Sequence, residues 1–90
     1  MTAKPKPIPG AVLVAYNQYK RQGLGFCLII ILDSGLYVEA SARTAKAFET
    51  RLKAWTFDTL PTLYRSEVRV FLCARGEIKE VTLTRRAILS

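Results

Sequence analysis

The stretch Phe26-Cys27-Leu28-Ile29-Ile30-Ile31-Leu32 decides the fold, because seven consecutive apolar side chains cannot be left in water. Isoleucines fill its middle, and Asp33-Ser34-Gly35 follows it as a turn signal. An unbroken apolar run of this length, bounded by a turn, predicts a strand buried on both faces of a sheet. Burial of one such side chain is worth about 1.5 to 3 kcal/mol, so this strand is expected to be the central one.

Composition limits the kind of protein that this strand can belong to. The chain has 90 residues, half of them apolar, and 14 Lys and Arg against 7 Asp and Glu give a net charge of +7. These values indicate one basic globular domain. A basic surface favours acidic partners, with nucleic acid first and anionic membrane or acidic protein after it. Net positive charge also serves plain solubility.

The N-terminal residues differ in composition from the rest. Prolines at 5, 7 and 9 and lysines at 4 and 6 predict a flexible arm over residues 1–10, followed by a single domain over residues 11–90. The apolar stretch after the arm is too short for a signal peptide, and residues 24–32 fall short of the roughly 20 apolar residues that span a bilayer. A cytoplasmic location is therefore expected.

The remaining pattern predicts an α+β domain with the order βββαββ. Strands are expected over residues 11–16, 26–32 and 36–40, with a basic hairpin loop over residues 17–23. A helix over residues 42–56, capped by Ser41, carries an apolar stripe of Ala45, Phe48, Leu52 and Trp55. Two further strands follow over residues 67–74 and 78–84. The expected result is a mainly antiparallel five-stranded sheet, or a strongly curved half-barrel, with one amphipathic helix packed on one face.

One helix covers only one face of such a sheet, yet the central strand is apolar on both. Pairing of two sheets in a homodimer through Cys27, Ile29 and Ile31 would cover the second face, and closure into a small barrel is the alternative. We favour the homodimer. A third way to use apolar surface is a ligand pocket near Trp55.

The two cysteines fall in different predicted strands and lack metal-ligand spacing. Cys27 and Cys73 are therefore expected to be buried free thiols, and a disulfide is possible only if their strands are neighbours.

Residue types argue against an enzyme. The chain has no histidine, which removes the commonest general base and most transition-metal sites. The carboxylates occur singly, and Gly23-Leu24-Gly25 lacks the third glycine and the lysine of a phosphate-binding loop. We expect no catalytic site, no metal and no cofactor.

Basic residues are the candidates for a binding site. In a three-strand meander the first connection and the end of the third strand share one end of the sheet. Lys20 and Arg21 are therefore expected near Arg43, beside the free amides of the helix N-terminus. Tyr19 offers a ring for base stacking. The other candidate nucleic-acid contacts are Lys46, Arg85 and Arg86. Charged residues on loops can also be simply solvated.

The sequence thus predicts a small basic binding module that forms homo-oligomers, with DNA or RNA as the leading partner. The alternatives are a structural or protein-interaction subunit that mainly self-associates, and a small domain that binds an apolar ligand. Convergence of the basic groups on one surface would favour the first of these.

Overall fold

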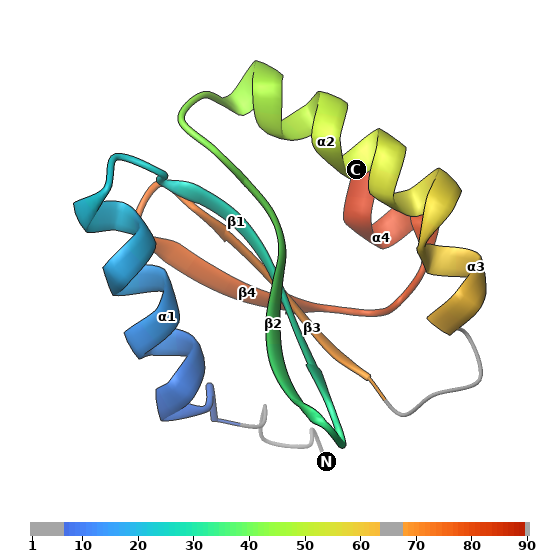
Figure 1. The fold of residues 1–90 in the computed structure, drawn as a ribbon, viewed down its shortest axis with the longest axis horizontal. Helices are drawn as coiled ribbons and strands as arrows, with labels where there is room; N and C mark the ends of the chain where they lie inside the picture. The colour runs from blue at the N-terminus through green and yellow to red at the C-terminus, as the bar shows by residue number, and fades with distance from the viewer. Residues whose placement is uncertain (1–6, 64–67, 90) are drawn as a thin grey trace, which may run out of the picture.

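The computed structural model describes residues 7–63 and 68–89 (Figure 1). Its elements in chain order are α1 (Gly10–Arg21), β1 (Phe26–Leu32), β2 (Gly35–Ala42), α2 (Ala45–Asp58), α3 (Leu60–Leu63), β3 (Arg69–Ala74), β4 (Glu77–Val81) and α4 (Arg85–Leu89). The strands form an antiparallel sheet, with α1 on one side of it and α2 and α4 on the other. The prediction of an α+β fold with an antiparallel sheet is confirmed.

β1 is an inner strand of the sheet, as its composition predicts. The strand order is β2-β1-β3-β4, so β1 pairs with β2 on one side and β3 on the other. The side chains of residues 27–30 have no exposed surface. The sheet described here has four strands, so the predictions of five strands and of a half-barrel do not match it.

The missing strand is the one expected over residues 11–16, which belong to α1. Val12 and Tyr16 are four residues apart, which places both on the buried side of a helix, whereas Val14 is 58% exposed. Residues 17–21 of the predicted hairpin loop belong to the same helix, and residues 22 and 23 follow its end. Pro9 precedes the helix, and Gly23 follows it with a φ of 81°.

α1 covers the face of the sheet that was expected to need a partner. Val12 and Tyr16 pack there against Cys27 and Ile29, and Ile31 is a half-buried neighbour. The remaining members of this core are Phe71 and Cys73. The chain therefore buries both faces of β1 itself, and the physical reason for expecting a homodimer through Cys27, Ile29 and Ile31 is gone.

The opposite face carries the larger core, formed by β1, β2, β3 and the helices α2 and α4. Its fully or nearly buried residues are Leu28, Ile30, Ala42, Phe48, Leu52, Trp55, Val70 and Ile88. The apolar stripe expected on the helix provides three of them. Ala45 differs, since it is exposed at the first position of α2.

A β-bulge in β2 lets one edge strand serve both cores. Leu28 pairs with Ala40 and Ile29 pairs with Val38, so Glu39 is an extra residue with no partner in β1. Side chains alternate along a strand, and an extra residue inverts the alternation. Val38 accordingly packs in the core under α1, whereas Ala40 packs in the core under α2.

The boundaries of α2 and of the C-terminal elements differ from the prediction. Thr44, not Ser41, caps α2, and its Oγ1 accepts a hydrogen bond from the Ala47 amide at 3.2 Å. β3 begins at Arg69, and residue 67 of the predicted strand lies outside the described residues. The last strand ends at Val81, and the chain then forms α4, which the sequence analysis did not predict.

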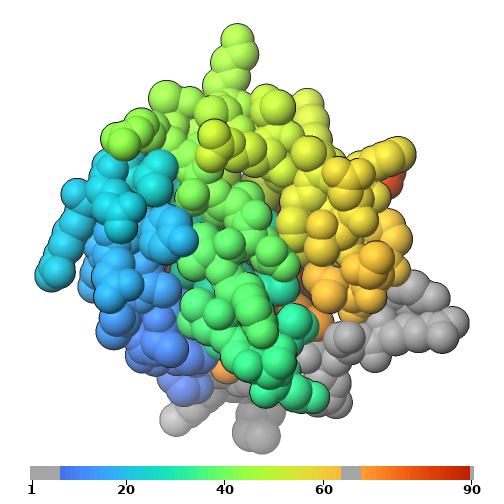
Figure 2. Space-filling view, in the orientation of Figure 1, coloured from blue at the N-terminus to red at the C-terminus, as the bar shows by residue number. Residues whose placement is uncertain are grey.

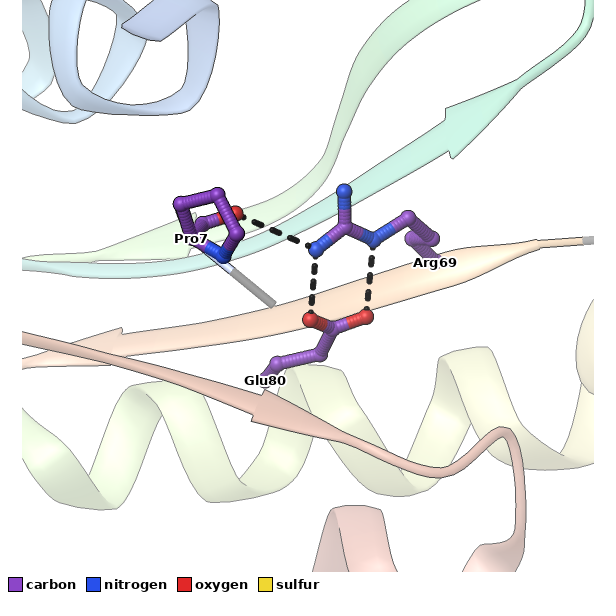
Figure 3. Close-up of polar contacts among 3 residues, drawn as sticks. All are labelled: Pro7, Arg69 and Glu80. Carbon is purple, nitrogen blue, oxygen red and sulfur yellow. Dashed lines mark hydrogen bonds and ion pairs between the residues drawn. The ribbon is translucent and has the colours of Figure 1, made fainter. Parts of the chain in front are cut away.

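Part of the predicted arm belongs to the folded domain. Residues 1–6 lie outside the described part, but the carbonyl oxygen of Pro7 accepts a hydrogen bond from Nη2 of Arg69 at 3.4 Å. The same guanidinium forms a two-pronged ion pair with Glu80, at 2.7 and 2.9 Å (Figure 3). This ion pair joins β3 to β4. The hydrogen bond to Pro7 holds the segment before α1 against the sheet.

Candidate nucleic-acid interface

The end of α1, the start of β1 and the turn between β3 and β4 are held together by one tyrosine. The hydroxyl of Tyr16 donates to the carbonyl oxygen of Gly25 at 2.8 Å and accepts from the amide of Gly76 at 3.1 Å. Tyr16 is 1% exposed. Burial raises the pKa of its hydroxyl above the usual value, although the bond from Gly76 acts in the opposite direction. The position of the last turn of α1 is therefore fixed relative to this end of the sheet.

Two cations extend from that last turn. The ammonium of Lys20 lies 4.8 Å from the ring centre of Tyr16, a cation–π contact, and Arg21 follows it. The C-terminal end of a helix carries partial negative charge, which favours cations at these positions. Both side chains are exposed, whereas Tyr19 is half-buried against the core under α1. Lys20 and Arg21 are thus presented to solvent from a rigid helix.

Arg43, in the connection between β2 and α2, lies beside the chain that follows α1. Its guanidinium lies directly over Gly23, with Cζ 3.5 Å from the point that a Cβ atom on Gly23 would occupy. Gly23 is two residues past Arg21. The structure therefore brings Arg43 close to the chain that follows α1. The segment that leads into β1 is a helix, whereas the sequence predicted a hairpin loop there.

The first turn of α2 adds positive potential to this end. It contains no acidic residue, and Lys46 is exposed in it. The free amides of a helix N-terminus carry partial positive charge. We call the group of Lys20, Arg21, Arg43 and Lys46 the basic end. Glu77, at the start of β4, is a carboxylate at the end of the sheet to which the β3–β4 turn belongs.

The cations of the basic end have no carboxylate partner in the described part of the chain. The ion pairs found in residues 7–63 and 68–89 join Lys53 to Glu49 and Arg69 to Glu80. Because no carboxylate of the described residues neutralises the charges of the basic end, we infer that they are available to an external anion.

Arg85 and Arg86 are not part of this group. Both are exposed on α4, which lies with α2 on the face of the sheet opposite α1.

Arg75, in contrast, was not singled out from the sequence, although it lies in the β3–β4 turn that Tyr16 holds. Its place in the two-residue turn Arg75-Gly76 was the available signal.

A hollow lies beside Trp55, where the sequence suggested an apolar pocket, and its lining is mixed. It measures about 430 Å³, lies between β2 and α2, and is lined by Glu39, Arg51 and Asp58 as well as by Trp55. Figure 2 shows β2 at the surface between α1 and α2. Trp55 is almost fully buried, and its Nε1 has no hydrogen-bond partner among the described residues.

Neither a metal site nor a membrane span was found in residues 7–63 and 68–89. Their Cys, Asp and Glu residues form no group of three or more that could hold a metal ion, and none of their helices is long and apolar enough to cross a membrane. Cys27 and Cys73 carry buried free thiols, and burial raises their pKa values to about 11 and about 12. A thiol needs a lowered pKa to act as a nucleophile at neutral pH, so these two are unsuited to that role.

Comparison of the chain with protein-family models, with curated proteins and with solved structures finds no match. The assignment of a function therefore depends on the geometry and charge of the residues described above.

Proposed function

We propose that this protein binds nucleic acid through the basic end, formed by Lys20, Arg21, Arg43 and Lys46. The observation that carries the proposal is the position of Arg43 over Gly23, because it adds a cation from the β2–α2 connection to those at the end of α1. A solvated, scattered charge distribution would not need such a contact.

The expected mode of binding is contact with the phosphate backbone. Lysine and arginine side chains that neutralise phosphates release condensed counterions, and this release supplies sequence-independent affinity. Tyr19 is half-buried, so only part of its ring is available for stacking on a base. Contacts of this kind position a protein on nucleic acid without reading its sequence.

Self-association is not part of this proposal. The face of the sheet that was expected to drive it is covered by α1 within one chain.

The test is the salt dependence of binding to short DNA and RNA, single-stranded and duplex, measured by fluorescence anisotropy. Each neutralised phosphate contributes a slope of about −0.9 for duplex, or about −0.7 for single strands, to the plot of log affinity against log salt. Replacement of Lys20 and Arg21 together by Gln should weaken binding and make the duplex slope shallower by roughly 1.8. Stability should scarcely change, because exposed charges contribute little to the fold.

The matched control is replacement of Arg85 and Arg86 by Gln, which removes the same charge from α4. If the basic end is the site, this variant should retain the larger part of the affinity and the slope. Equal losses in both double variants would mean that net charge alone attracts nucleic acid. Absence of binding by the wild-type protein at low salt would refute the proposal.

A further inference from the structure

A second hollow lies on the α2 face of the sheet, between the start of β1, the end of β3 and the helices α2 and α4. It measures about 430 Å³, within the range of small-molecule sites. Most of its lining is apolar, and the large side chains that line it are Phe26, Phe48, Leu52, Leu72, Ile88 and Leu89. Its two charged lining residues are Arg75 and Glu49. We call this hollow the apolar pocket.

The two charges at the apolar pocket are not equivalent. Glu49 is paired with Lys53, with 3.0 Å between the carboxylate and the ammonium. Arg75 is exposed and has no ion pair within the part of the chain that the structure describes. The pocket therefore combines an apolar lining with one positive charge that is not neutralised.

Arg75 also occupies a position where its residue type is unfavourable. It has a φ of 52° in a tight turn, followed by Gly76 with a φ of 81°. Two successive positive φ values are typical of a type I′ hairpin turn, whose first position favours Asn, Asp or Gly. An arginine there costs conformational energy that asparagine would avoid.

We propose that the apolar pocket binds a linear aliphatic carboxylate, with the alkyl chain among the apolar side chains and the carboxylate on the guanidinium of Arg75. Charge complementarity selects an anion, because the other charged lining residue already has a cation as its partner. A guanidinium matches a carboxylate with two parallel hydrogen bonds. The apolar lining favours a hydrocarbon chain over a polar body.

This inference does not depend on the proposed function. The apolar pocket lies on the α2 face of the sheet, whereas Lys20 and Arg21 extend from α1 on the other side. Lys46 of the basic end follows Ala45, which lines the pocket, so substitutions at Lys20 or Arg21 on one hand and at Arg75 on the other are the ones that separate the two sites.

Calorimetric titration of the whole protein with butyrate, hexanoate and octanoate tests the apolar part. Each methylene that enters the pocket should improve the affinity about fourfold. Ala45→Leu, at an exposed helix position that lines the pocket, should weaken octanoate binding by reducing the space without unfolding the protein. An affinity that does not change from butyrate to octanoate would overturn the proposal.

The charge is tested with 1-octanol and octylammonium, which keep the alkyl chain and change the head group. Octanoate should bind roughly tenfold to a hundredfold more tightly than octanol, because that ratio corresponds to the free energy of a hydrogen bond to a charged group. Arg75→Asn should abolish that difference and still preserve the turn. Equal binding of octanoate and octylammonium, or an unchanged octanoate affinity in Arg75→Asn, would refute the assignment.

Arg21→Gln is the matched control, since it removes one exposed arginine from the opposite side of the sheet. It should leave the octanoate affinity unchanged while it weakens nucleic-acid binding. Conversely, Arg75→Asn should affect octanoate far more than nucleic acid. Failure of one site would therefore leave the other measurable.

Discussion

Cys27 and Cys73 lie directly opposite each other on the neighbouring antiparallel strands β1 and β3. Neither has any exposed surface, and both belong to the core under α1. Both thiols are free. A disulfide was possible only if the two strands were neighbours, and that condition is met. The helix α1, which covers this face, keeps reagents away from both sulfur atoms.

Because both thiols are buried, neither should react with a thiol reagent at pH 8 in the native protein. Their pKa values, raised to about 11 and about 12 by burial, also keep them protonated at that pH. Spectrophotometric titration with a disulfide reagent should give no fast reaction in buffer and two equivalents in denaturant. Rapid modification of either cysteine in buffer would mean that α1 does not cover this face.

The same raised pKa values predict a loss of stability in alkaline solution. Above the ordinary thiol pKa of 9.0 the unfolded chain loses protons that the folded chain keeps, so the free energy of unfolding should fall as the pH rises from about 9 to about 11. Melting temperatures across this range measure the effect. The Cys27→Ala, Cys73→Ala double variant should show a shallower fall, and an identical fall would assign the effect to other groups.

Two valines distinguish the helix from the strand that the sequence first suggested. In a strand, Val12 and Val14 would share a face, but in α1 Val12 is fully buried and Val14 is 58% exposed. Val12→Asp should lower the free energy of unfolding by about 4 kcal/mol or more, because it buries an unpaired charge. Val14→Asp should change it by less than about 0.5 kcal/mol. Denaturant unfolding measures both, and similar losses would favour the strand.

The hydroxyl of Tyr16 should be worth more than that of any exposed tyrosine. Tyr16→Phe leaves the Gly76 amide and the Gly25 carbonyl oxygen without their partner, and the loss should be about 1 to 3 kcal/mol. Tyr37→Phe is the matched control, because its hydroxyl donates to the exposed Ser34 hydroxyl at 3.0 Å. Its expected effect is close to zero. Equal effects would show that Tyr16 does not connect α1 to the β3–β4 turn.

Deletion of Glu39 tests the bulge. Without the extra residue, the side chains on one side of it would move to the opposite face, so Ala40 could no longer pack under α2 while Val38 packs under α1. The deletion should unfold the protein or lower its melting temperature by many degrees. Glu39→Ala keeps the extra residue and should be tolerated. A deletion variant as stable as the wild type would show that β2 has no fixed register.

Part of the candidate site could be predicted from the sequence and part could not. The approach of Arg43 to Gly23, two residues past Arg21, followed from the order of elements, since any short connection into β1 shares an end with the exit of β2. Arg75 and the apolar pocket did not follow, because they depend on how β3, α2 and α4 meet. Contacts between elements far apart in sequence leave no local pattern.

The sequence by itself determined the central strand and the helix that covers one face. Seven consecutive apolar residues require a strand that is buried on both faces. Phe48, Leu52 and Trp55 fall on one side of the chain only if the segment is a helix. The turn Arg75-Gly76 likewise separates two predicted strands, a pattern that is typical of a β-hairpin.

Only the tertiary structure decided what covers the second face. Residues 11–16 are apolar at spacings that suit a strand as well as a helix, and six residues are too few to separate the two periods. The choice is made by burial: as a helix, this segment can place Val12 and Tyr16 over Cys27 and Ile29 and complete a core within one chain. An additional strand would have left that face of β1 uncovered.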